Sequence, residues 1–183
     1  MGAAYHARMV YVALLRGINV GGKAMVPMAD LRETCASVGC EDVVTYIQSG
    51  NVVLRSPLRA DKLQASLVAA IGERFGFEPA VMIRTAEEMA AVVARNPHPG
   101  ADEKHLHVGF LPAAPDTATE RCLGTIDCAP EQVAVVGREL YLHLPNGMGR
   151  AALPVKMERC LRPTPVTVRN WRTVTKLVEL TNG

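Results

Sequence analysis

The spacing of hydrophobic residues switches along the chain between that of strands and that of helices. Residues 9–15 form an unbroken apolar run rich in Val and Leu, which is typical of a buried strand. Between residues 61 and 75, large apolar residues recur every four positions, the spacing of one helix face. The first half therefore predicts the order β-α-β-β-α-β-α. Its strands are expected at 9–15, 43–47, 52–54 and 80–84, and its helices at about 26–38, 61–75 and 85–95.

The same order begins again after residues 96–100, whose sequence NPHPG is typical of a linker. The two halves also end alike, because VMIRTAEEMAAVV and VTVRNWRTVTKLV each contain a strand, an arginine, a capping residue and a helix. This likeness predicts an internal duplication. The second set of strands is expected at 105–111, 132–136, 139–144 and 165–169, and the helices at about 115–124, 151–161 and 170–180.

The predicted fold is α+β, with two repeated β-α-β-β-α-β (ferredoxin-like) subdomains, each followed by an extra helix. The first subdomain is expected at residues 9–96, the linker at 97–103 and the second subdomain at 104–182. Such a unit usually forms an antiparallel sheet with strand order 4-1-3-2 and both helices on one face.

A glycine-rich loop follows the first strand, and we call residues 16–23 the glycine loop. Arg16 and Lys23 stand at its two ends, and its glycines allow positive φ angles that can bring backbone N–H groups together. The spacing fits a phosphate-binding loop, but Ala24 stands where such a loop has a magnesium-binding Ser or Thr. Pro27 indicates that the next helix starts near Val26, too late for a true phosphate loop. The missing Ser or Thr and the late start of the helix exclude an ATPase. The glycines and the two cations still favour the binding of an anion.

The predicted topology brings polar segments together in each half. Because the first strand ends where the third begins, the glycine loop should lie beside residues 48–51 (QSGN), which we call the polar turn. In the second half, the loop at residues 146–150 should lie near Asn170 and Arg172. Each cluster combines cations with amide side chains near a helix N-terminus, so both favour the binding of a negatively charged group.

Composition narrows the classes of partner. The chain has 183 residues, 49% of them hydrophobic, a net charge of +2 and only 4% aromatic residues. Near-neutral charge and few aromatics argue against non-specific nucleic-acid binding and against a base-stacking surface. No apolar run is long enough to span a membrane, and the N-terminal MGAAYHAR lacks a hydrophobic signal core. We therefore expect a cytoplasmic protein whose five cysteines, which form no C-x-x-C pair, are reduced.

Four motifs resemble a known family. RGINVGGK, TYIQSGNVV, YLHLPNGMGR and RNWRTVTKL are similar to segments of the bacterial family called "domain of unknown function 1697", and the similarity runs from about Met9 to Leu180. The resemblance implies an α+β fold of two similar subdomains and no assigned reaction. The segment AALPVKMERCL after Arg150 departs from the family pattern, because it carries Pro154 and no polar Ser-Lys pair.

The residues suggest three other kinds of function. Ser49 is an exposed hydroxyl without an obvious base, so an enzyme using Ser49 or Lys23 is an alternative. His105, His107 and His143 lie on strands expected to be neighbours, but we predict no metal site. Basic residues near the C-terminal end make non-sequence-specific nucleic-acid binding a further alternative.

The leading interpretation is a cytoplasmic protein of unknown molecular function that binds an anionic small molecule, such as a phosphate-bearing one, at Gly-rich loops between two subdomains, and the resemblance implies a bacterial source. No catalytic residue, cofactor, metal or membrane partner is predicted, and the oligomeric state is left open. The second half would complete the site if the two repeats face each other. The ligand-binding residues are Arg16, Asn19, Gly21, Gly22, Lys23, Gln48, Ser49, Asn51, Arg150, Asn170 and Arg172.

Overall fold

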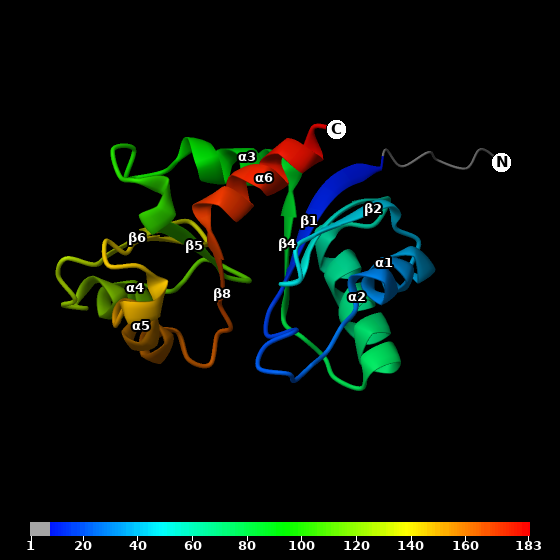
Figure 1. The fold of residues 1–183 in the computed structure, drawn as a ribbon, viewed down its shortest axis with the longest axis horizontal. Coiled ribbons are helices and arrows are strands. Elements are labelled where there is room, and N and C mark those ends of the chain that lie inside the picture. The colour runs from blue at the N-terminus through cyan, green and yellow to red at the C-terminus, as the bar shows by residue number, and fades with distance from the viewer. Residues whose placement is uncertain (1–7) are drawn as a thin grey trace. The chain divides into compact units, whose positions relative to one another are not determined.

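The structure is a computed structural model that describes residues 8–183 (Figure 1). The segment that the sequence predicts to lack a signal core lies, except for Arg8, outside these residues. The first set of elements is β1 (Met9–Leu15), α1 (Met28–Ser37), β2 (Glu41–Tyr46), β3 (Asn51–Ser56), α2 (Ala60–Phe75), β4 (Val81–Thr85) and α3 (Ala86–Ala94). The second is η1 (Glu103–His105), β5 (Leu106–Phe110), α4 (Thr117–Gly124), β6 (Gln132–Val136), β7 (Glu139–His143), η2 (Met148–Arg150), α5 (Leu153–Leu161), β8 (Thr167–Asn170) and α6 (Trp171–Thr181).

The strands form two separate four-stranded antiparallel sheets. One has the order β2-β3-β1-β4 and the other the order β6-β7-β5-β8. The predicted α+β class is therefore confirmed. In each sheet the first strand of its half lies in the middle, so the segment that leaves the end of β1 starts between β3 and β4.

The chain divides into two compact units, whose limits differ from the predicted subdomains. The first unit contains Met1–Met89 and Leu177–Gly183, and the second contains Ala90–Lys176. The limits of the units fall inside α3 and α6, because the C-terminal part of α3 packs on the second sheet and that of α6 packs on the first. In the first unit, the end of α6 lines a cavity of about 390 Å³ with Val10 and Val53. In the second, the hydroxyl of Tyr141 donates a hydrogen bond to the carbonyl of Val92, at 2.7 Å.

Each sheet packs its own pair of helices. In the first unit, α1 and α2 contribute Leu31, Leu67 and Ile71 to a core with Ala13 and Val52. In the second, Leu123 of α4 and Met157 of α5 pack against apolar residues of β7, among them Leu140 and Leu142. Burial of apolar surface on one face of each sheet supplies the main driving force for folding.

Local signals for helix ends agree with the structure. The side chains and backbones of Thr85 and Glu88 exchange two hydrogen bonds, as the predicted capping box requires. Asn170 accepts a bond from the backbone N–H of Thr173 at 2.8 Å at the start of α6. Helix α1 begins at Met28, directly after Pro27, so the structure places no helix N-terminus at Lys23.

Gly50 is the position where the fold tolerates no side chain. It has a φ of +77°, and a Cβ added there would lie 2.7 Å from Cβ of Leu15. Gly17 has a similar φ of +75° but open space around it. Gly50→Ala should therefore lower the free energy of unfolding by about 2 kcal/mol or more, and Gly17→Ala by about 1 kcal/mol. Urea unfolding of both variants measures the difference, and equal losses would show that the close approach of Leu15 costs nothing.

Candidate functional site

The glycine loop ends in a tight hairpin. The backbone N–H of Asn19 donates to the carbonyl of Ala24 at 3.0 Å, and that of Lys23 donates to Val20 at 3.1 Å. Gly21 and Gly22 between them have φ angles of +58° and +73°, the signs of a type I′ turn. The N–H groups of Asn19 and Lys23 are therefore used within the hairpin. The loop has fewer N–H groups to give to a ligand than the sequence suggested.

The side chain of Asn19 ties this loop to the polar turn. Its Oδ1 accepts a hydrogen bond from the backbone N–H of Val26 at 2.7 Å, and its Nδ2 donates to the carbonyl of Val26 at 3.0 Å. The same Nδ2 donates to the carbonyl of Gln48 at 2.8 Å. The predicted proximity of the glycine loop and the polar turn is therefore found, and one amide side chain maintains it.

The polar turn is held from inside by Asn51. This side chain is fully buried, and its Nδ2 donates to the carbonyl of Tyr46 at 3.1 Å and to Oγ of Ser49 at 2.9 Å. The backbone N–H of Leu15 donates to the carbonyl of Gly50 at 2.8 Å. Ser49 thus takes part in the hydrogen bonds of its own turn, which gives no support to the role of a nucleophile.

Five of the eight residues predicted in the first unit fall into two groups. Asn19 and Asn51, both predicted to bind the ligand, hold the loop and turn in place. Arg16, Lys23 and Gln48 are exposed. The arrangement therefore carries an arginine, a lysine and a glutamine at the surface, on a scaffold fixed by the two asparagines.

Backbone strain is concentrated in the same place. Four non-glycine residues in the part that the structure describes have positive φ angles, and three of them are Asn19, Ala24 and Ile47. Positive φ is uncommon for alanine and unusual for a β-branched residue such as isoleucine. Strained backbone is found preferentially at binding and catalytic sites. Asn19 lies in the glycine loop, whereas Ala24 directly follows that loop and Ile47 directly precedes the polar turn.

The second cluster is assembled differently from the prediction. Asn170 and Arg172 line a cavity of about 520 Å³ together with Asp102, Glu103 and Lys104. Nζ of Lys104 forms an ion pair with Asp102 at 2.7 Å. The sequence analysis placed Asp102 and Glu103 in the linker and included none of residues 102–104 in the site, although Asp102 is a recognisable cap that accepts a bond from the N–H of Lys104.

Arg150 does not contribute to the lining of this cavity. It ends η2, and its N–H donates to the carbonyl of Gly147 at 3.2 Å. The loop that carries it follows β7, whereas Asn170 ends β8, and β5 lies between these two strands. The expected cluster of residues 146–150 with Asn170 and Arg172 is therefore interrupted by one strand. That these residues join Arg16 and Lys23 in one site stays a prediction.

The strand register overturns the grouping of His105, His107 and His143. Leu106 lies opposite His143, and residues directly opposite share a face, so His107 is on the other face of the sheet. His107 is buried, and its Nδ1 has no hydrogen-bond partner. Burial lowers the pKa of this imidazole and favours its neutral form. Among residues 8–183, no group of three or more His, Cys, Asp and Glu side chains could hold a metal.

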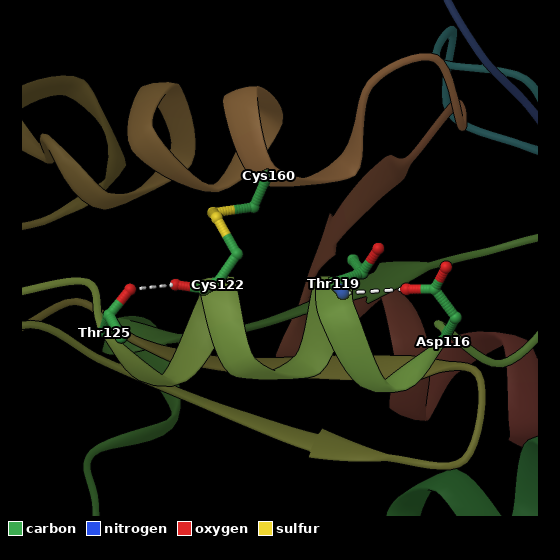
Figure 2. Close-up of a disulfide and its surroundings, with 5 residues drawn as sticks. All are labelled: Asp116, Thr119, Cys122, Thr125 and Cys160. Atoms are coloured by element: carbon green, nitrogen blue, oxygen red, sulfur yellow. Dashed lines mark hydrogen bonds between the residues drawn. A yellow bond between two sulfur atoms is a disulfide. The ribbon is translucent and has the colours of Figure 1, made fainter.

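The structure also corrects the expectation of five reduced cysteines. Cys122 of α4 and Cys160 of α5 form a disulfide, 38 residues apart in sequence (Figure 2). Helix α4 is capped by Asp116, whose side chain accepts a bond from the N–H of Thr119 at 2.7 Å (Figure 2). Burial raises the pKa of the free thiol of Cys35 to about 12 and that of Cys40 to about 11, so neither is a reactive thiolate. The cytoplasmic location stays a prediction.

Within residues 8–183, no helix has the length and apolar character needed to span a membrane.

Comparisons with known proteins concern the family and the fold. The sequence profile of the family described as "Protein of unknown function (DUF1697)" matches residues 9–141. The solved structure of the conserved bacterial protein SP0830 from Streptococcus pneumoniae is similar, with a TM-score of 0.77 and 24% sequence identity. The similarity covers 96% of this chain and 99% of that one, and at this identity it shows the fold alone. No curated protein is significantly similar to the chain.

Replacing Asn19 tests its role in holding the loop. Asn19 has a φ of +54°, so Asn19→Gly keeps the backbone unstrained and removes only the amide. Loss of its three hydrogen bonds should lower the free energy of unfolding by about 1–3 kcal/mol. Lys23→Ala, an exposed change in the same loop, should cost no more than about 0.5 kcal/mol. Chemical denaturation checks both, and an unchanged stability of Asn19→Gly would contradict the assignment.

Proposed function

The chain belongs to the DUF1697 family of proteins of unknown function, and for this member we propose that it binds an anionic small molecule at the glycine loop and the polar turn. The observation that supports the proposal most directly is the bond from Nδ2 of Asn19 to the carbonyl of Gln48. It keeps three exposed polar side chains, those of Arg16, Lys23 and Gln48, on two adjoining segments.

The chemistry of these side chains favours a phosphate or carboxylate group. Arginine can bind such a group with two parallel hydrogen bonds, and lysine adds a compact positive charge. Gly21 and Gly22 are exposed at the hairpin tip, with no atom within 4 Å of the position that a Cβ would take. A ligand can therefore approach the backbone there without meeting a side chain.

The glycine loop is held in place before any ligand binds. Arg16 follows directly after β1, and its backbone N–H donates to the carbonyl of Ala80 at 2.9 Å. The glycine loop is thus tied to neighbouring segments at two points, at Arg16 through this bond and at Asn19 through its bond to the carbonyl of Gln48. A fixed loop loses less conformational entropy when a ligand binds, which favours binding by few contacts.

We also propose that the chain is an internal duplication and that polar residues of the second unit contribute to binding. We interpret the chain as a duplicated ferredoxin-like unit, an interpretation that the equal strand orders of the two sheets support. Arg150, Asn170 and Arg172 are retained as donors of the second unit. Asn170 and Arg172 line the cavity described above. Nothing favours catalysis by Ser49, because its hydroxyl accepts a bond from Asn51.

Calorimetric titration with inorganic pyrophosphate tests the proposed site. Lys23→Ala and Gln48→Ala should each weaken binding at least about fivefold, because each removes one charge-assisted or amide contact. The matched control is Lys62→Ala, which removes one positive charge from the exposed surface of α2 and should bind like wild type.

Two results would count against the site. One is the absence of saturable pyrophosphate binding, and the other is an equal loss of affinity in Lys23→Ala and in the Lys62→Ala control. Tighter binding of a single-stranded RNA with a steep salt dependence would instead favour the nucleic-acid alternative.

A further inference from the structure

Two histidines of the second unit face each other. His98 lies in the segment after α3, and His143 ends β7. Their ring centroids are 5.6 Å apart, and the ring planes are inclined by 34°. Nε2 of His98 is buried and has no hydrogen-bond partner. A buried polar atom without a partner is costly and requires an explanation, such as an ion that normally occupies the position.

The fold holds the backbone at both histidines. The backbone N–H of His98 donates to Oδ1 of Asn96 at 3.0 Å, and the carbonyl of His98 accepts from Ala101 at 3.1 Å. Pro97 and Pro99 restrict φ on either side. His143 belongs to β7, which is paired with β5 on one side and β6 on the other. Imidazole is the commonest side-chain ligand in protein metal sites.

A single face of the second sheet carries the pair. Tyr141 lies two residues before His143 on β7, so the two side chains project from the same face. The hydroxyl of Tyr141 donates to the carbonyl of Val92, which holds the end of α3 over this face. The chain reaches His98 six residues later, which explains how a connecting segment comes to lie against the end of β7.

We propose that His98 and His143 together bind one divalent transition-metal ion, such as Cu²⁺ or Zn²⁺. Two imidazoles on one ion, with metal–nitrogen bonds of about 2.1 Å, have centroids about 5 Å apart, somewhat more on a tetrahedral Zn²⁺ and somewhat less on a tetragonal Cu²⁺. The observed 5.6 Å is close to this separation. Gln132 lies directly opposite His143 in the register of β6 and β7, so its amide oxygen is on the same face. Solvent or an exogenous ligand would fill the remaining positions, as in metal sites that keep positions open.

Titration of metal-free protein with CuCl₂, followed by calorimetry, tests this site. Wild type should bind one equivalent saturably, and His98→Ala and His143→Ala should each bind at least about tenfold more weakly, because each removes one of two ligands. His105→Ala is the matched control, since His105 lies in the same unit but outside the pair, and it should bind like wild type.

Electron paramagnetic resonance of the copper complex identifies the ligands directly. Wild type should show hyperfine coupling to two imidazole nitrogens, and each single variant should lose one. Copper binding that is equally strong in both variants, or the absence of saturable binding in wild type, would overturn the proposal. If His143→Ala does not fold, as circular dichroism would show, His98→Ala decides the question, because His98 lies outside the sheet.

Discussion

The close contact between the end of β1 and the turn that joins β2 to β3 determines the geometry of the first unit. Gly50 leaves no room for a side chain beside Leu15, whose N–H donates to the carbonyl of Gly50. Asn19 then fastens the outgoing loop to Gln48. Because β1 pairs with both β3 and β4, this contact connects the middle of the sheet to the glycine loop. The exposed cations of the loop depend on it for their position.

Polar residues of the loop and turn therefore have two distinct roles. The amide groups of Asn19 and Asn51 form hydrogen bonds within the protein, as buried and half-buried amides generally must. Arg16, Lys23 and Gln48 are left at the surface. The two experiments are also independent, since the site variants of the pyrophosphate experiment lie in the first unit and those of the copper experiment in the second. Failure of one proposal leaves the other unaffected.

Much of the fold could be predicted because its signals are local. The hydrophobic spacing predicts the order of strands and helices, and the capping pair of Thr85 and Glu88 predicts the start of α3. The roles of Asn19 and Asn51 could not be predicted, since a loop asparagine looks the same whether its partner is a ligand or a carbonyl seven residues away. The disulfide and the His98–His143 pair depend on tertiary placement, because residues 38 and 45 positions apart meet only once the sheet has formed. Strand register, which sequence spacing does not fix, separated His107 from His143.

The central claim is that the glycine loop and the polar turn act as one pre-formed anion site. A ¹⁵N–¹H NMR titration of the full chain with pyrophosphate tests it most directly. We predict that the backbone signals of Gly21, Gly22 and Lys23 and the side-chain amide of Gln48 shift along one shared saturation curve. Shifts confined to the loop, separate curves for loop and turn, or no shifts in either segment would contradict the claim.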